Sequence, residues 1–125
     1  MKKEWEIILY TTETGKCPVN DFMNGLSDKD RAEMIKKINY LKQVGNKIKR
    51  PRAAYLRDKI YELRITLTKN NTRTLYFFFN DNNEIILTHT FIKKTDKVPD
   101  SEIEKAIKYK NNYLKRFSKE TPNET

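Results

Sequence analysis

Residues 60–92 read IYELRITLTKNNTRTLYFFFNDNNEIILTHTFI, and this stretch decides the fold. It contains three runs rich in β-branched and aromatic residues, at positions 60–67, 72–79 and 84–92, with short Asn-rich segments between them. Such runs favour β-strands, and short Asn-rich connections are typical of turns between antiparallel neighbours. The stretch therefore predicts a three-stranded antiparallel meander.

The segments before the meander predict a strand and two helices. Residues 5–10 are β-favouring, and Pro18 opens a short segment whose apolar residues recur at helical spacing. Ser27, followed three residues later by Asp30, is a capping signal for a longer amphipathic helix. Gly45 is a suitable end for that second helix.

The segment after the meander predicts one more helix. Pro99 and Asp100 precede an amphipathic pattern that continues to Phe117. The complete prediction is one α+β domain over residues 1–117 with the order β-α-α-β-β-β-α, in which a small antiparallel sheet packs with two N-terminal helices and a C-terminal helix. Residues 118–125 are expected to form a flexible polar tail.

Residues 46–59 have neither helical nor strand periodicity, and Pro51 prevents a regular helix there. We therefore predict a loop with a concentrated positive charge. The cations of this basic segment are Lys47, Lys49, Arg50, Arg52, Arg57 and Lys59.

The composition is strongly basic, since 26 Lys and Arg residues against 17 Asp and Glu residues give a formal net charge of +9 over 125 residues. The 7 Tyr, 6 Phe and one Trp supply enough large side chains for a packed core, which excludes a wholly disordered chain. A large positive charge attracts polyanions. Nucleic acid is therefore the leading class of partner.

The apolar runs are too short for a membrane span. The longest covers residues 75–79, whereas a spanning helix needs about 20 residues. Glu4 and Glu6 interrupt the place where a secretory signal would have its apolar region. We therefore expect a cytoplasmic protein without a membrane partner.

Cysteine and histidine are scarce. With Cys17 as the one cysteine and His89 as the one histidine, the chain can form neither an internal disulfide nor a zinc site of the usual Cys/His kind. The three glycines match neither a phosphate-binding loop nor a dinucleotide fingerprint. We expect no metal and no cofactor.

Charged side chains interrupt the predicted strands at particular positions. Period two places Glu62 and Arg64 on the face opposite the apolar side chains of their strand. Arg73 lies near the start of the next strand, and His89 shares a face of the third with Lys93. Surface ion pairs, a hydrogen-bonded structural histidine and solvated lysines are the plain alternatives for these residues.

If these cations converge on one face of the sheet, they form a site for a phosphate. Clustered cations stabilise the charge that develops on phosphate oxygens without a metal ion. RNA supplies its own nucleophile, the 2′-hydroxyl, so cleavage needs only proton transfer and charge stabilisation. Nucleic-acid binding without cleavage suits the same residues.

Four spaced motifs resemble a known family. They are YELR at 61–64, RTLYFF at 73–78, LTHTFIKKT at 87–95, and Pro99 followed by Glu102, Ile103 and Ala106. In this order the motifs resemble the phage-derived Gp49-like branch of the RelE/ParE toxin superfamily, which includes HigB-type toxins. The resemblance covers roughly Trp5 to Tyr113, and it implies a RelE-like fold.

The resemblance also implies a function. Toxins of this kind enter the ribosomal A site and cleave mRNA by 2′-hydroxyl attack, and a HigA-like helix-turn-helix antitoxin neutralises them. The same superfamily contains ParE-like inhibitors of gyrase, so gyrase inhibition is the second hypothesis. A basic nucleic-acid-binding module without toxicity is the third.

The resemblance assigns roles by position. Arg64 and Arg73 are the expected phosphate-stabilising arginines, and Lys93 with Lys94 forms the basic end of the last strand. Lys93, His89 and Tyr61 are rival candidates for proton transfer. The expected contacts to the RNA backbone are Arg57, Lys59, Arg52 and Lys94. Many relatives have Gly where this chain has Lys59 and Thr90.

Overall fold

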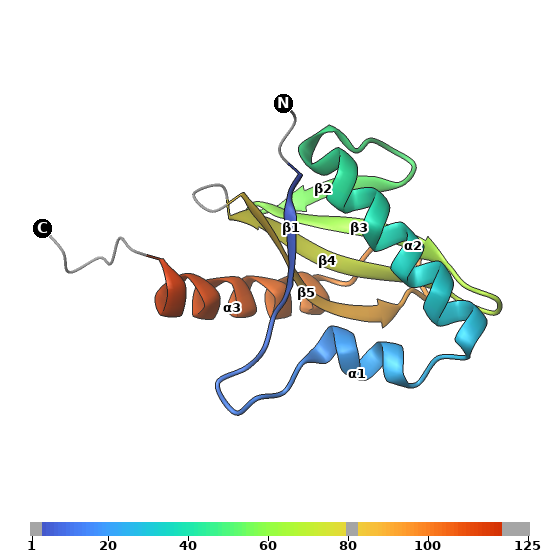
Figure 1. The fold of residues 1–125 in the computed structure, drawn as a ribbon, viewed down its shortest axis with the longest axis horizontal. Coiled ribbons are helices and arrows are strands. Elements are labelled where there is room, and N and C mark those ends of the chain that lie inside the picture. Colours follow the sequence, from blue (N-terminus) through green and yellow to red (C-terminus); the bar gives the residue numbers. More distant parts are fainter. Residues whose placement is uncertain (1–3, 80–82, 119–125) are drawn as a thin grey trace, which may run out of the picture.

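The chain forms a five-stranded sheet with helices on both faces in the computed structural model, which describes residues 4–79 and 83–118 (Figure 1). The predicted α+β class is confirmed. In chain order the elements are β1 (Glu6–Leu9), α1 (Pro18–Asn24), α2 (Asp28–Val44), a 3-10 turn (Gly45–Lys47), β2 (Ala53–Arg57), β3 (Ile60–Thr66), β4 (Asn71–Phe79), β5 (Glu84–Ile92) and α3 (Asp100–Phe117).

The strands lie in the order β1-β5-β4-β3-β2. The predicted meander is confirmed, because β3, β4 and β5 pair as antiparallel neighbours. The predicted antiparallel pairing holds from β2 to β5, whereas β1 pairs with β5 in parallel. β1 is only four residues long, and its composition carries no signal for strand direction. Its partner β5 is the last strand in the chain, so the direction of β1 depends on how all the intervening elements are connected.

The prediction of a loop over residues 46–59 is wrong for its second half, where Ala53–Arg57 forms β2. β2 pairs antiparallel with β3 and forms one edge of the sheet. Its register shifts between Tyr55 and Arg57, which breaks the alternation that identifies a strand. The observed order is therefore β-α-α-β-β-β-β-α.

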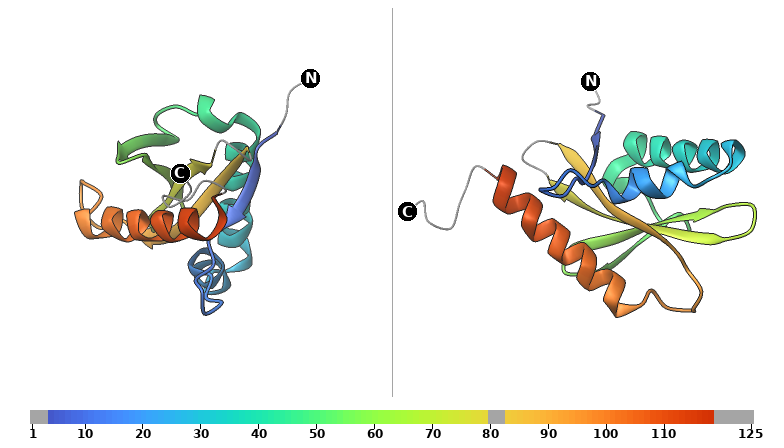
Figure 2. Two further views of the ribbon diagram at one scale, coloured as in Figure 1. Left: turned by 90° about the vertical axis from the view of Figure 1, so that its left-hand side faces the viewer. Right: turned by 90° about the horizontal axis from the view of Figure 1, so that it is seen from below.

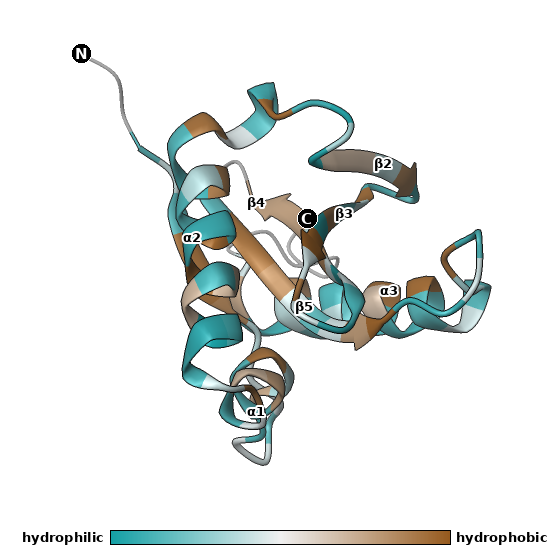
Figure 3. Ribbon diagram, turned by 90° about the vertical axis from the view of Figure 1, so that its right-hand side faces the viewer, coloured by the Kyte–Doolittle hydropathy of each residue, from teal (hydrophilic) through white to brown (hydrophobic). Residues whose placement is uncertain are grey.

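Alternation along the strands divides the core into two layers. On the first face, Leu63, Tyr76 and Leu87 pack against α1 and α2. On the other face, Leu75, Phe77 and neighbouring side chains pack against α3. Figure 2 shows α1 and α2 on one side of the sheet and α3 on the other, and Figure 3 shows hydrophobic β4 and β5 between them. The sheet is therefore covered on both faces.

Both ends of α2 follow the predicted signals. The Asp30 N–H donates to Ser27 Oγ at 3.2 Å, which caps the N-terminus. Gly45 ends the helix at φ 55° and ψ −126°, a conformation that side chains with a Cβ rarely adopt. A Cβ on Gly45 would lie 2.0 Å from Nε1 of Trp5, so the indole ring occupies the space that a side chain would need.

Gly45→Ala is expected to lower the free energy of unfolding by at least about 2 kcal/mol, because it combines backbone strain with overpacking. Urea titration followed by circular dichroism measures the change. Gly25→Ala is the matched control, since a Cβ there would meet only the Phe22 carbonyl oxygen at 3.6 Å and φ is −87°. Equal stability of the two variants would contradict the steric argument.

The C-terminal helix ends at Phe117, and the Ser118 N–H donates to the Leu114 carbonyl at 2.9 Å. The rest of the expected tail lies outside the described residues. Within residues 4–79 and 83–118, no helix is long and apolar enough to cross a membrane.

Candidate active site

Arg64 and Arg73 lie directly opposite each other on β3 and β4. Two like charges at such a cross-strand position repel each other. Glu62, two residues before Arg64 on the same face, offsets this repulsion with a buried carboxylate. Glu62, Arg64 and Arg73 form a cluster on the same face of the sheet as Leu75 and Phe77, which pack against α3.

The Glu62 carboxylate contacts both guanidinium groups. Arg64 Nη2 donates to Glu62 Oε2 at 3.1 Å, and Arg73 Nε lies 2.9 Å from Glu62 Oε1 as an ion pair without hydrogen-bond alignment. Arg73 Nη1 also donates to the carbonyl of Thr72 at 2.9 Å. One carboxylate therefore orients two arginines, and the cluster keeps one net positive charge.

The two arginines differ in exposure. The Arg73 side chain is 11% exposed and the Arg64 side chain 30% exposed. Burial lowers the pKa of Arg73, and the attraction of Glu62 opposes that effect. Arginine remains protonated near neutral pH because its ordinary pKa is far higher. Arg64 is therefore the arginine that presents its charge to solvent, and Arg73 lies behind it.

A cavity of about 300 Å³ opens beside this cluster. Arg64 and Glu62 contribute one wall, and Lys93, immediately after β5, contributes another. Basic groups from β3 and from the end of β5 therefore meet around one space. The full lining is Tyr55, Leu56, Arg57, Glu62, Arg64, Lys93, Asp96, Lys97, Val98 and Ile103.

His89 lies on the same sheet face as Arg73 because β5 contains a bulge. The register with β4 passes from Tyr76↔Leu87 to Leu75↔His89, so Thr88 is the extra residue. One extra residue reverses the face of everything after it. Without the bulge, His89 would point toward α2.

The His89 ring is buried and hydrogen-bonded. Its Nε2 lies 2.9 Å from Glu102 Oε1 in the first turn of α3, and its Nδ1 lies 3.1 Å from Thr88 Oγ1. Burial lowers the pKa of His89, and the hydrogen bond with Glu102 opposes that shift. His89 does not line the cavity. It attaches β5 to the beginning of α3.

The lowered pKa of His89 predicts a pH-dependent stability. The unfolded chain binds a proton near pH 6.5, at which the buried ring stays neutral, so acidification favours unfolding. The free energy of unfolding is therefore expected to fall as pH decreases below about 6.5. His89→Asn is expected to lose this part of the dependence in urea titrations at several pH values. Identical pH profiles for variant and wild type would contradict the assignment.

Arg57 is held by carboxylates rather than exposed as a free cation. Its guanidinium donates to Asp58 at 2.5 Å, to Asp100 at 2.6 Å and to Glu104 at 2.7 Å. Hydrogen bonds with these carboxylates, that of Glu104 first, raise the pKa of Arg57. Two of the partners belong to α3, so Arg57 fastens the end of β2 to that helix.

The other cations predicted to bind RNA lie at the surface. Asp58 and Lys59 form the turn between β2 and β3, with φ values of 51° and 65°. Glycine adopts such left-handed values most readily, which explains why many relatives have glycine at the position of Lys59. Arg52 places its guanidinium 4.7 Å from the centre of the Tyr40 ring. Lys94 is exposed after β5.

Tyr61 is not brought to the arginines. It lies on the opposite face of the sheet, where its ring packs against Tyr76 and Phe78. The tyrosine that lines the cavity beside Arg64, hereafter the arginine cavity, is Tyr55. The sequence did not predict it as a site residue because its strand is short and irregular. The hydroxyl of Tyr55 accepts the Lys59 N–H at 3.1 Å.

No group of three or more His, Cys, Asp or Glu side chains in the described part of the chain is arranged to hold a metal ion. Arg64, Lys93 and Lys97 line the cavity together with Glu62 and Asp96, and such a group of cations can bind a phosphate and stabilise added negative charge.

Comparison with known proteins identifies the family to which the chain belongs. A search of curated proteins found no match. Among solved structures, the crystal structure of the isolated E. coli RelE toxin is similar over 82% of this chain and 98% of that chain, with 14% identity and a TM-score of 0.49. The model of the family described as "Phage derived protein Gp49-like" matches residues 21–111, well over half of the chain. The sequence resemblance to this family is thereby confirmed, and the chain belongs to the phage-derived Gp49-like proteins.

Proposed function

We propose that this protein is the toxin of a type II toxin–antitoxin pair and that it cleaves mRNA in the ribosomal A site. One observation carries the proposal: Arg64 of β3 and Lys93, immediately after β5, line one cavity, and Arg73 of β4 lies behind them, 2.9 Å from the Glu62 carboxylate. Membership of the Gp49-like family supports it, as does the sequence resemblance to RelE/ParE toxins.

The proposed reaction uses the RNA as its own nucleophile. The 2′-hydroxyl oxygen attacks the adjacent phosphorus, the bond to the 5′-oxygen of the next nucleotide breaks, and a 2′,3′-cyclic phosphate remains. One proton leaves the 2′-hydroxyl and one reaches the departing 5′-oxygen. Arg64, the exposed arginine at the cavity, stabilises the charge on the phosphate oxygens.

Lys93 is the proposed proton-transfer group, because it lines the cavity whereas His89 and Tyr61 do not. His89 becomes a positioning residue through its contact with Glu102. Tyr55 joins the site as a second hydroxyl-bearing group at the cavity. Arg73 positions Glu62 and adds positive charge from behind.

The remaining cations have two proposed roles. Arg52, Lys59 and Lys94 are exposed and contact the RNA backbone. Arg57 holds β2 against α3, which keeps Tyr55 at the cavity. The proposed partners are the ribosome, its mRNA and a HigA-like helix-turn-helix antitoxin, all in the cytoplasm.

The test is a map of mRNA 5′ ends across the transcriptome after induction in bacteria. The control is the double variant Arg64→Ala/Arg73→Ala, with its folding checked by circular dichroism. We expect new 5′ ends within translated regions, phased to the reading frame, in the wild type alone. Growth arrest without new ends, accompanied by DNA damage signals, would instead indicate gyrase inhibition.

A further inference from the structure

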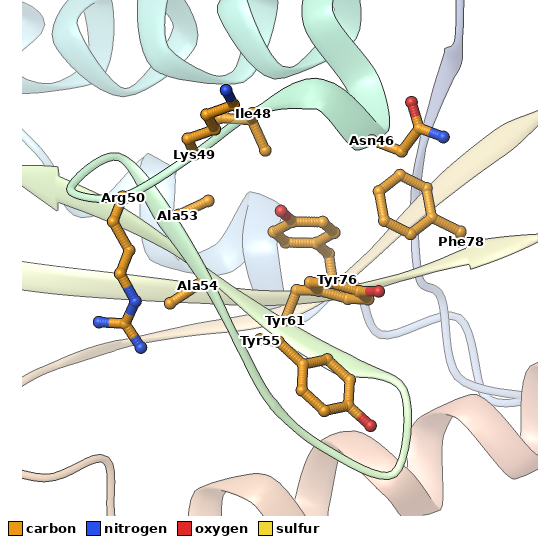
Figure 4. A pocket seen from close by; sticks show the side chains of 10 residues that line it. All are labelled: Asn46, Ile48, Lys49, Arg50, Ala53, Ala54, Tyr55, Tyr61, Tyr76 and Phe78. Atoms are coloured by element: carbon orange, nitrogen blue, oxygen red, sulfur yellow. The ribbon is translucent and has the colours of Figure 1, made fainter.

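A second and larger pocket lies on the opposite face of the sheet, beneath the segment that follows α2 (Figure 4). Its volume is about 540 Å³, within the range of small-ligand sites. Four aromatic rings from three neighbouring strands form much of its wall, so we call it the aromatic pocket. Its lining is Asn46, Ile48, Lys49, Arg50, Ala53, Ala54, Tyr55, Tyr61, Tyr76 and Phe78.

Tyr76 gives this pocket a polar group without a partner. The residue is 0% exposed, and its hydroxyl makes no hydrogen bond with any described residue. Figure 4 shows its ring standing in the pocket between β4 and Ile48. Buried hydroxyl groups are normally hydrogen-bonded to protein or to water, so the Tyr76 hydroxyl is free to pair with a ligand that enters the pocket.

The rings of the aromatic pocket provide surfaces for a flat ligand. Tyr61 stacks near Tyr76 with ring centres 5.5 Å apart, and it meets Tyr55 edge-on at 5.1 Å. Tyr55 is 53% exposed, so its ring is open to contact at the edge of the sheet. Unpaired nucleobases bind such platforms by stacking.

Positive charge borders the aromatic pocket on one side. Lys49 and Arg50 line it and are exposed, and Pro51 and Arg52 continue the same basic segment. Aromatic surfaces beside cations are typical of sites for single-stranded nucleic acid, in which the bases stack and the phosphates bind the cations.

Tyr55 connects the aromatic pocket to the arginine cavity, because it lines both. It belongs to the edge strand β2, so a bound strand can pass around this edge without crossing the sheet. The two sites can therefore engage neighbouring parts of one RNA.

We propose that the aromatic pocket binds an unpaired nucleobase of the RNA whose backbone lies at the arginine cavity, with the Tyr76 hydroxyl hydrogen-bonded to the edge of the base. This inference rests on the proposed function for the identity of the RNA as substrate. The face of the sheet opposite Arg64 and Arg73 would then help to select the RNA sequence that is bound.

A nucleobase fits these observations better than an apolar side chain of a protein partner. An apolar side chain inserted by a protein would fill the pocket but leave the Tyr76 hydroxyl unpaired, whereas the edge of a base carries hydrogen-bonding groups. An acidic segment would also be attracted by the exposed cations Lys49 and Arg50, but it has no flat ring to stack on Tyr55 and Tyr61.

The test measures binding of short fluorescein-labelled homopolymeric single-stranded RNAs by anisotropy. All proteins carry Arg64→Ala, which suppresses cleavage, and are compared with and without a change in the pocket. Tyr76→Phe removes one oxygen and keeps the ring. We expect it to weaken binding of at least one homopolymer by about threefold to tenfold, while the stability of the free protein stays equal or rises.

Tyr61→Ala is expected to weaken binding of all four homopolymers by about tenfold, because stacking tolerates any base. Phe117→Ala is the control, since it removes an exposed aromatic ring from α3, outside both cavities. Unchanged binding in both pocket variants overturns the inference, even where mRNA cleavage is observed. Loss of neutralisation by a co-expressed antitoxin with unchanged RNA binding also overturns it and indicates a protein-docking site.

This assay separates the inference from the proposed function. Binding is measured without ribosomes or cleavage, so a failure to find new mRNA ends in cells leaves the binding result intact. Conversely, unaltered RNA affinity in the pocket variants leaves the proposed function standing, because cleavage is measured separately with Arg64 intact.

Discussion

Arg64→Ala is expected to slow mRNA cleavage on programmed ribosomes by about 10²–10³-fold, the effect of removing one donor to a developing oxyanion. Arg64 is the arginine of the cluster that lines the cavity, and its side chain is 30% exposed, so its loss leaves the core intact. The free energy of unfolding is expected to change by less than about 1 kcal/mol, since the lost ion pair is partly exposed. Single-turnover cleavage of a defined message measures the rate.

Two further variants define the role of Arg64. Arg64→Lys keeps the charge but loses the two-pronged geometry of the guanidinium, so an intermediate rate is expected. Lys36→Ala removes one positive charge from the exposed surface of α2 and is expected to cleave at the wild-type rate. If Lys36→Ala slowed cleavage as much as Arg64→Ala, general charge attraction rather than a local site would explain the activity.

Glu62→Ala is expected to lower the free energy of unfolding by about 3 kcal/mol, because it leaves buried positive charge without a partner. Arg73 accounts for most of this destabilisation, since its side chain is 11% exposed and lies 2.9 Å from the Glu62 carboxylate. Arg64 retains contact with water and contributes less. Urea titration of the purified protein measures the loss.

Glu33→Ala is the matched control for a lost carboxylate. Glu33 pairs with Lys37 at 3.5 Å on α2, with both side chains about one-third exposed, so its removal is expected to change stability by less than about 0.5 kcal/mol. Glu62→Leu/Arg73→Leu is expected to recover most of the stability that Glu62→Ala loses, because it removes the charge together with its partner. A double variant as unstable as Glu62→Ala would show that packing, rather than the unpaired charge, determines the loss.

Alternation within the strands made most of the sheet predictable. β5 has the bounds that its sequence predicts, and β3 and β4 differ from prediction by one residue at an end. The placement of Glu62 and Arg64 opposite the apolar face followed from the same alternation. The capping residues Ser27 and Gly45 predicted both ends of α2, because helix caps are local interactions.

Features that depend on distant contacts were not predictable. The bulge at Thr88 decides the face of His89, yet nothing in the local sequence marks it. The ion pairs of Arg57 join it to residues 43 and 47 positions away in α3. β2 was missed because a register shift and a high density of cations hide a strand of five residues. The absence of Tyr55 from the predicted site follows from that omission.

The outer strands of the sheet also affect how the protein associates with copies of itself. A long, flat outer strand has free backbone groups that recruit another chain and start fibre growth. Here β1 has only four residues, and β2 is interrupted by its register shift and ends in a charged side chain. Neither edge strand is long and regular enough to pair with a strand of another molecule. The protein is therefore protected from edge-to-edge aggregation although its central strands are strongly apolar.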